Sequence, residues 1–395
     1  MNRLILFILC LSTLACNKKE NNDVTDQREE AVQAIIDSLY KVYPSSTGLM
    51  LHVESPKNGL SYSSGAGFSD REAQTAIKSD QPALIASSIK TYVAASILRL
   101  QEEGKLTIED SIGAYLTEET STLFRNDGYK LDEIKIKHLL SHTSGIADYV
   151  NDDYFDFINK NQTYRWTREE QMALATRVGD PLGEAQSISQ YADVNYLLAT
   201  EIIEQLHGKP FYTAMRELLK FEELGLNDTW FPSLEEKPAQ SEDLIHQYWD
   251  EEDWGGLSLD FAWDSKLHDL SWDLYGGGGI AASMKDMARF SYHLFNGDII
   301  EDEQILQLIK EDVVTSDGKA KTYRLGLAEA EVGGFKAYGH GGFWGTIFFY
   351  IPDLDTSLAL SVSQRKDKMN PIRDILNIVT GELAVMQTEQ ETNMN

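Results

Sequence analysis

Two side chains with complementary chemistry stand three residues apart in the segment Ser87-Ser88-Ile89-Lys90. Positions three apart on a helix share a face, so a helix here would turn Ser87 and Lys90 the same way. A serine hydroxyl becomes an effective nucleophile only when a neighbouring group takes its proton. The residues that follow are apolar on nearly every side, which predicts a buried helix. Because burying a lysine without a function is costly, this pattern predicts a nucleophilic Ser87 activated through Lys90.

Other catalytic arrangements have less support in the sequence. His138 and His142 lie four residues apart and could ligate a metal from one helical face, but the run lacks the Glu of H-E-x-x-H and a third ligand. The glycines at 276–279 lack the Gly-Lys-Ser/Thr of a phosphate-binding loop, and no G-x-S-x-G is present. The only cysteines are Cys10 and Cys16, so the folded part has no thiolate nucleophile and no disulfide. We expect no metal and no cofactor.

Five segments, in the same order, resemble motifs of the serine β-lactamase and penicillin-binding-protein superfamily, in its class C-like branch. The resemblance extends over nearly the whole chain after residue 30. The segments are Ser87-x-x-Lys90, His138-Leu-Leu-Ser-His142-Thr-Ser-Gly145, Tyr191-Ala-Asp193-Val-Asn195-Tyr196, the run from Gly277 to Phe290, and His340-Gly341-Gly342.

The resemblance implies a role for each matching residue. Ser87 would be the acylated nucleophile, and Lys90 and Tyr191 would move its proton, with Tyr191 as a phenolate-like base. His340 would line the opposite wall of the cleft on an edge strand. The backbone N–H groups of Ser87 and Phe343 would form the oxyanion hole, the usual source of the largest share of acyl-transfer catalysis.

The chain also departs from the family pattern at two of these motifs. Asp193 stands where the family usually has Asn, and a carboxylate beside Lys90 should raise the pKa of the lysine and leave Tyr191 as the base. The segment His340-Gly341-Gly342 lacks the permanent cation and the hydroxyl of K-T-G. We expect Asp193, His340 and Gly342 to contact substrate. Recognition of a substrate carboxylate should be weak, so uncharged esters or amides should react better than β-lactams.

These residues predict an exported serine hydrolase that works through a Ser87 acyl-enzyme on an ester, amide or β-lactam. Esterase, D-peptidase or carboxypeptidase, and β-lactamase activity all stay open. The alternative is a catalytically weakened penicillin-binding or sensing lipoprotein that keeps the fold. The net charge of −28 disfavours nucleic acid and anionic lipid as partners, which leaves a small-molecule or peptide acyl substrate.

The elements that must position these residues can be read from periodicity and turn residues. Helices are expected over 29–43, 87–103 and 284–295 and from Asn370-Pro371 onward. Hairpins are expected at 48–54 with 60–64 and at 346–351 with 357–362. This order predicts an α+β fold, in which an antiparallel sheet of N- and C-terminal strands is flanked by helices and interrupted by a mostly helical insertion at roughly 105–275. Four tryptophans, at 249, 254, 263 and 272, are expected either to line a substrate cleft or to cover the core.

The first 25 residues predict export. Residues 1–15 combine a basic start with an apolar run too short to span a bilayer, which is typical of a signal peptide. Cys16 after Ala15 resembles a bacterial lipoprotein cleavage site, with Cys16 as the lipid attachment point and residues 16–25 as a tether. The protein would then be membrane-anchored and face the periplasm or the cell surface. Residues 26–388 form the hydrolase domain, and 389–395 are expected to be a flexible tail.

Overall fold

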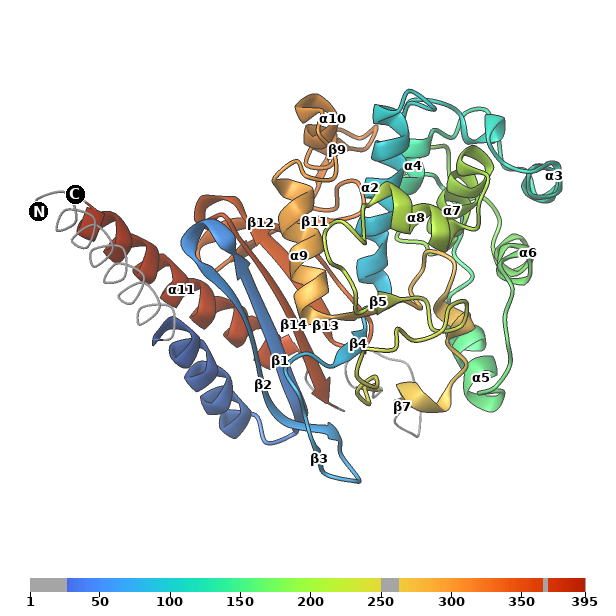
Figure 1. Ribbon diagram of the computed structural model, residues 1–395. Helices are drawn as coiled ribbons and strands as arrows, with labels where there is room; N and C mark the ends of the chain where they lie inside the picture. Colours follow the sequence, from blue (N-terminus) through green and yellow to red (C-terminus); the bar gives the residue numbers. More distant parts are fainter. Residues whose placement is uncertain (1–26, 250–262, 365–368, 395) are drawn as a thin grey trace, which may run out of the picture.

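The computed structural model describes residues 27–249, 263–364 and 369–394, and these fold around a seven-stranded antiparallel sheet (Figure 1). The spatial order is β11-β12-β13-β14-β1-β2-β3, so strands from the two ends of the chain meet where β14 pairs with β1. This confirms the predicted α+β fold. The strands are β1 (Ser46–Ser55), β2 (Leu60–Asp70), β3 (Thr75–Ala76), β11 (Ala328–Val332), β12 (Phe335–Gly341), β13 (Thr346–Ile351) and β14 (Thr356–Gln364). The predicted leader, tether and Trp254 lie outside the described residues.

Both faces of the sheet are covered, and β1 shows why. Its side chains alternate between the two faces, as in any strand, and all ten residues are buried. Leu49, Leu51 and Val53 pack in one apolar cluster with the helical residues 27–42 and with α11 (Met369–Met394), whereas Met50 belongs to the cluster on the other side. Helix α9 (Met284–Phe295) lies against that other face, as Figure 1 shows.

The C-terminal helix is longer than the sequence indicated. Residues 389–394, expected to be a flexible tail, are the last turns of α11, which ends at Met394. Its final turns are rich in Glu, Gln and Met, all good helix formers, so nothing in them stops a helix that packing has already started. Among the described residues no helix is both long and apolar enough to cross a membrane.

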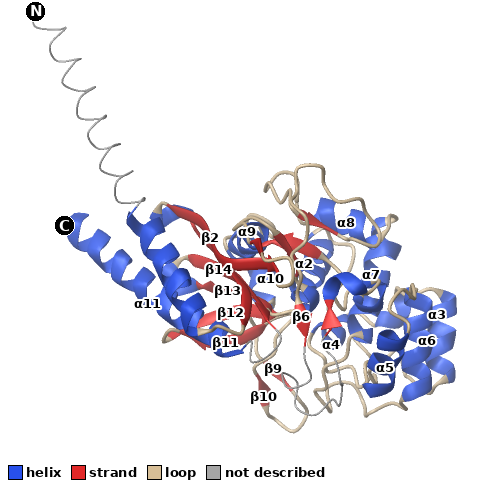
Figure 2. Ribbon diagram, turned by 90° about the horizontal axis from the view of Figure 1, so that it is seen from below, coloured by secondary structure: helices blue, strands red, loops and turns tan. Residues whose placement is uncertain are grey.

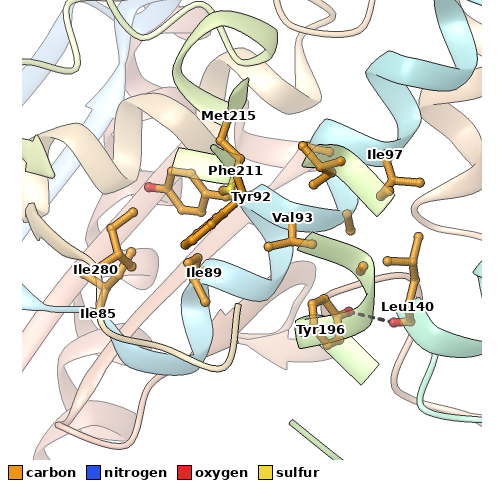
Figure 3. Close-up of a cluster of buried hydrophobic side chains, with 14 of the residues drawn as sticks. Ile85, Ile89, Tyr92, Val93, Ile97, Leu140, Tyr196, Phe211, Met215 and Ile280 are labelled. Carbon is orange, nitrogen blue, oxygen red and sulfur yellow. Dashed lines mark hydrogen bonds between the residues drawn. The ribbon is translucent and has the colours of Figure 1, made fainter. Parts of the chain in front are cut away.

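The helical insertion is built around α2 (Ile89–Glu102), whose first ten residues are all buried. Figure 3 shows Ile89, Tyr92 and Val93 of α2 beside Phe211 and Met215, and the Tyr92 ring stacks on Phe290 at 3.5 Å between centroids. Figure 2 shows α3, α5 and α6 at the end of the molecule opposite α11. The remaining helices are α3 (Glu118–Asn126), α4 (Ile136–Leu140), α5 (Asp152–Lys160), α6 (Arg168–Val178), α7 (Val194–His207), α8 (Phe211–Leu218) and α10 (Glu303–Leu308).

Short strands join the insertion to the main sheet region. The three-stranded sheet β4-β8-β5 carries the chain directly into the segment that holds Ser87, because β4 ends three residues before it. Two further pairs, β6 with β7 and β9 with β10, connect loops. These strands are β4 (Pro82–Leu84), β5 (Thr229–Trp230), β6 (Tyr248–Trp249), β7 (Trp263–Asp264), β8 (Ala281–Ser283), β9 (Val313–Val314) and β10 (Ala320–Lys321).

Candidate active site

Ser87 lies in a single 3₁₀ turn, Ala86–Ser88, that leads into α2. The sequence predicted a helix from Ser87, whereas the α-helix begins at Ile89. Ala86 has φ of 45°, a left-handed conformation that is strained for a residue with a Cβ. Such strain persists where surrounding structure enforces it, as is common at functional sites. One source of that enforcement is Ser88, whose hydroxyl donates to the carbonyl of His340 on β12 at 3.1 Å.

The end of β12 packs directly against the backbone that precedes Ser87. A Cβ on Gly342 would lie 2.2 Å from the carbonyl oxygen of Ile85, so only glycine allows this approach. Thr346 closes the same turn, because its backbone carbonyl accepts the Gly342 N–H at 2.7 Å and its hydroxyl donates to Ile85 O at 3.2 Å. The sheet and the turn that carries Ser87 are therefore held in fixed register.

Lys90 is fully buried beneath Ser87, and its ammonium group has three close oxygen partners. They are Ser87 Oγ at 3.2 Å, the Gly277 carbonyl at 2.7 Å and Asp193 Oδ1 at 2.7 Å. Burial alone would lower the pKa of Lys90, but the carboxylate of Asp193 and further negative groups outweigh it and raise that pKa above its usual value. This agrees with the expectation of a charged Lys90, which can stabilise an anion but cannot accept the serine proton.

Tyr191 lies in the loop before α7 and is 40% exposed, and its hydroxyl is close enough to Ser87 and Lys90 for both to lower its pKa. Lys90 Nζ is 5.0 Å from the centre of the ring. Burial of the hydroxyl raises the pKa of Tyr191 to about 12; Lys90 lowers it, and Asp193 raises it further. The resting group at neutral pH is thus a phenol, and the phenolate, the form that could act as a base, is a minor form.

The two histidines of the second motif make different contacts. The His142 ring packs against Tyr191 at 4.1 Å between centroids, with the two rings tilted by 33°, and its Nδ1 accepts the backbone N–H of Ala192 at 3.2 Å. His138 Nδ1 accepts the Lys135 N–H at 3.1 Å instead. His142 therefore supports the loop that carries Tyr191. No group of three His, Cys, Asp or Glu side chains within the described ranges is arranged to hold a metal ion.

His340 is neutral and has both ring nitrogens engaged. Its Nδ1 lies 2.7 Å from the Gly341 carbonyl, which can only accept, so Nδ1 carries the proton. Its Nε2 is therefore the acceptor for the hydroxyl of Tyr323 at 3.0 Å. Burial and the nearby Lys90 lower the pKa of His340 to about 3. A histidine in this state offers a substrate carboxylate neither a positive charge nor a free N–H.

The position of His340 in the sheet needs one correction. The sequence placed it on an edge strand, but β12 is second from the edge, with β11 outside it. The pairing of β11 with β12 ends at Gly339, so His340 and Gly341 have a ladder partner only on the β13 side. The short strand β11, Ala-Glu-Ala-Glu-Val, does alternate apolar and polar residues, but Val332 is its only β-branched residue, so its strand signal is weak.

These residues meet at the mouth of a cavity of about 610 Å³. One wall is aromatic and aliphatic, and the part beside Ser87 is acidic. The lining residues are Ser87, Asp148, Val150, Asn151, Asp152, Phe155, Tyr191, Asp193, Trp249, Trp272, Asp273, His340, Gly341, Gly342, Phe343, Gly345, Thr346, Ile347, Met369 and Ile372. Gly342 and Phe343 thus reach the cavity as expected, while Trp249 and Trp272 line it and Trp263 is buried behind them.

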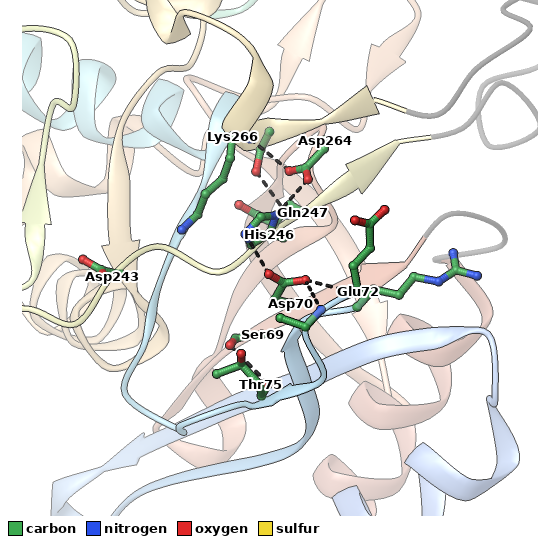
Figure 4. A network of polar contacts seen from close by, with 12 residues as sticks. Ser69, Asp70, Glu72, Thr75, Asp243, His246, Gln247, Asp264 and Lys266 are labelled. Carbon is green, nitrogen blue, oxygen red and sulfur yellow. Dashed lines mark hydrogen bonds and ion pairs between the residues drawn. The ribbon is translucent and has the colours of Figure 1, made fainter.

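A polar network fixes the strand that carries Trp249 (Figure 4). His246 lies between two carboxylates, with Nδ1 at 2.8 Å from Asp264 and Nε2 at 3.5 Å from Asp70. The next residue, Gln247, exchanges hydrogen bonds with the backbone of Leu84, which precedes Ser87. Trp249 of the aromatic wall and Ser87 are consequently positioned by contacts to the same stretch of backbone.

Three residues of the site escaped the sequence analysis: Asp148, Asp273 and Tyr323. Asp148 follows the second motif by three residues and accepts the backbone N–H of Asp193 at 3.0 Å. Asp273 precedes the glycine run, which was the one signal near it. Tyr323 lies outside every motif, and only the structure reveals its contacts with His340, His142 and Tyr191.

Comparison with known proteins places these observations in a family context. The Beta-lactamase family profile matches residues 55–381. Putative penicillin-binding protein PbpX of Bacillus subtilis (strain 168) is 24% identical over 316 residues, 78% of this chain and 70% of that protein. Teichoic acid D-alanine hydrolase of Staphylococcus aureus is 28% identical over 178 residues, 44% of this chain and 40% of that protein.

The fold is shared with solved structures as well. The crystal structure of D-amino acid amidase from Ochrobactrum anthropi SV3 complexed with L-phenylalanine amide superimposes with a TM-score of 0.71 and 22% identity. The match covers 90% of this chain and 99% of that one. At this identity the likeness shows a common fold.

Proposed function

Because the chain belongs to the β-lactamase family of serine hydrolases, we propose that it hydrolyses small esters and amides through a Ser87 acyl-enzyme and handles β-lactams poorly. The observation that carries this proposal is the state of His340, which is neutral and has both ring nitrogens engaged. Among the described residues that line the cavity, none is Lys or Arg. A β-lactam carboxylate would lose its water here without gaining a cation, which is unfavourable.

The reaction would proceed in two acyl transfers. The phenolate of Tyr191 takes the Ser87 proton while Oγ bonds to the substrate carbonyl carbon, and Lys90 stabilises the anions involved. Collapse of the tetrahedral intermediate breaks the bond to the leaving alcohol or amine, which receives the proton from Tyr191. Water then attacks the carbonyl carbon of the acyl-enzyme and gives a proton to Tyr191. Ser87 Oγ takes this proton from Tyr191 when its bond to the acyl group breaks and the carboxylic acid leaves. No cofactor enters this sequence.

The names of one relative and one structural neighbour support esters and amides as substrates. One is a teichoic acid D-alanine hydrolase and the other a D-amino acid amidase, which suggests D-alanyl esters and amino acid amides as substrates to test on this chain. The aromatic wall formed by Phe155, Trp249 and Trp272 would bury an apolar part of the substrate.

The selectivity is tested by comparing kcat/KM for p-nitrophenyl butyrate with that for nitrocefin, a chromogenic cephalosporin. The proposal predicts that the ester reacts faster by at least about 100-fold, because the cephalosporin carboxylate has no partner. Faster hydrolysis of nitrocefin would contradict the proposal. A stable Ser87 adduct without turnover would also contradict it, and would favour a penicillin-binding or sensing protein.

We further propose that the protein is an exported lipoprotein acylated on Cys16. The basis is the short apolar run that ends at Ala15-Cys16 and the polar segment after it. Metabolic labelling with radioactive palmitate in a bacterial host should mark the wild-type chain and leave Cys16→Ala unlabelled. Palmitate on both, or on neither, would contradict the proposal.

A further inference from the structure

Three carboxylates surround the space beside Ser87, and one of them has no partner. Asp193 pairs with Lys90 at 2.7 Å, and Asp148 accepts a backbone N–H at 3.0 Å. The side chain of Asp273 is 7% exposed, lines the cavity and has no hydrogen bond or ion pair with any described residue. An unpaired buried carboxylate is costly, so Asp273 calls for a ligand or a proton.

The carboxylates of Asp273 and Asp193 lie beside the residues that contact Ser87 Oγ. A Cβ built on Gly277 would lie 3.2 Å from Asp273 Oδ1 and 3.3 Å from Asp193 Oδ2, so the two carboxylates flank the same residue. The carbonyl of Gly277 accepts from Lys90, which in turn contacts Ser87 Oγ. A cationic group held by these carboxylates would therefore lie close to a carbonyl carbon that Ser87 attacks.

The three carboxylates around the space are too close and too buried to be ionised together at neutral pH. Lys90 is the one cation that faces it from the described elements, and it already pairs with Asp193. His142 and His340 are neutral because burial lowers the pKa of each, and Tyr191 is a phenol. Burial and the charge of Asp193 raise the pKa of Asp148 to about 8 and that of Asp273 well above its usual value. Asp273 is therefore held as a neutral acid when no cation is bound, and a bound cation would favour its carboxylate and take the place of the proton.

The ligand is better matched by an ammonium group than by a metal ion. The three carboxylates do not converge as metal ligands, since no such cluster occurs in the part of the chain that the structure describes. An ammonium group needs only acceptors within hydrogen-bond reach and tolerates their divergence.

We propose that Asp273, together with Asp193 and Asp148, forms a subsite for the free amino group of an aminoacyl ester or amide. This rests on the proposed acyl-enzyme at Ser87 and specifies its acyl group as that of an amino acid with an unblocked amine. The chemistry is unchanged: the Ser87 Oγ–carbon bond forms, the bond to the alcohol or amine breaks, and water releases the amino acid.

The subsite also couples recognition to catalysis. The negative charge of Asp193 raises the pKa of Tyr191, so a bound ammonium that offsets it lowers that pKa and increases the phenolate fraction. An amino group on the substrate should thus raise kcat as well as lower KM. A subsite that only held the substrate in place would change KM alone.

The test compares alanine benzyl ester, in both D and L forms, with benzyl isobutyrate, in which a methyl group replaces the ammonium. The wild-type full-length protein should favour one alanyl ester by about 100-fold in kcat/KM, with a share of the gain in kcat. In Asp273→Asn this ratio should fall by at least about tenfold. Asp353→Asn, a change at an exposed aspartate of the loop between β13 and β14, is the matched control and should keep the wild-type ratio.

The outcomes separate this inference from the function on which it rests. Equal turnover of alanyl and isobutyryl esters by the wild type, or an unchanged ratio in Asp273→Asn, would overturn the ammonium subsite and leave the acyl hydrolase intact. Absence of turnover on every ester, with no adduct on Ser87, would overturn both. If Asp273→Asn does not fold, Asp148→Asn takes its place and should likewise lower the ratio of kcat/KM between the alanyl and isobutyryl esters. A wild-type preference below threefold for the alanyl ester, or an unchanged ratio in Asp148→Asn, would then overturn the subsite.

Discussion

Replacing Asp193 with Asn is the most informative single perturbation of the catalytic group. The carboxylate lies 2.7 Å from Lys90 Nζ and raises the pKa of both Lys90 and Tyr191. Asn has nearly the same shape and keeps an oxygen that can accept from Lys90. The substitution therefore removes one negative charge and leaves the packing almost unchanged.

The size of the effect follows from Coulomb's law. One charge acting on the Tyr191 hydroxyl across about 8 Å at an effective dielectric constant of 20 contributes roughly 2 kcal/mol. That corresponds to roughly 1.5 pKa units, since 1.36 kcal/mol shifts a pKa by one unit. Because Asp193 raises the pKa of Tyr191, its removal lowers that pKa, and the phenolate fraction at pH 7 should rise by roughly 30-fold.

The assay is the pH dependence of kcat/KM for p-nitrophenyl butyrate, a neutral substrate that makes no use of the acidic subsite. In Asp193→Asn the acid limb should move to lower pH by roughly 1.5 units, and the rate at pH 7 should rise. Adding Tyr191→Phe should abolish the gain, because the base is gone. An acid limb that stays in place, or a gain that survives the loss of Tyr191, would refute the role given to Tyr191.

Three further changes test separate parts of the account. His340→Lys restores a permanent cation to the His340-Gly341-Gly342 motif and should speed acylation of Ser87 by benzylpenicillin about tenfold more than it speeds hydrolysis of p-nitrophenyl butyrate. Equal effects on the two substrates would contradict the role given to His340. Gly342→Ala should lower the free energy of urea unfolding by about 1–3 kcal/mol because its Cβ meets Ile85 O, whereas Gly341→Ala, with no contact under 3.5 Å, should change it little. Burial raises the pKa of Asp286 to about 7 from an ordinary value of 3.8, so its contribution to stability is complete below pH 4 and lost as pH rises through 7. Asp286→Asn keeps an acceptor for Asp228 N–H and Thr229, and should gain stability over the wild type at pH 8 but not at pH 5; an identical pH dependence would contradict this.

The sequence predicted the parts of the site that depend on local spacing. Ser87 and Lys90 meet because residues three apart share a helical face, and Tyr191 and His340 belong to motifs whose order was readable. The hairpin of β1 and β2 and that of β13 and β14 followed from turn residues between apolar runs.

What the sequence could not show depends on contacts between distant loops. Asp148 and Asp273 are two among 63 acidic residues, and only the fold brings them to Asp193. The hydroxyl of Tyr323 occupies Nε2 of His340, and no spacing rule connects those positions. Likewise the pKa of Tyr191 depends on how deeply its hydroxyl is buried, which no motif records.

The central claim, that Ser87 carries the acyl group, is tested most directly by intact-mass measurement and peptide mapping after reaction with a fluorophosphonate. The account predicts one adduct on the peptide that contains Ser87, with labelling and ester turnover both lost in Ser87→Ala and both retained in Ser79→Ala, a serine change outside the cavity lining. Labelling of another residue, or ester turnover that persists in Ser87→Ala, would contradict it.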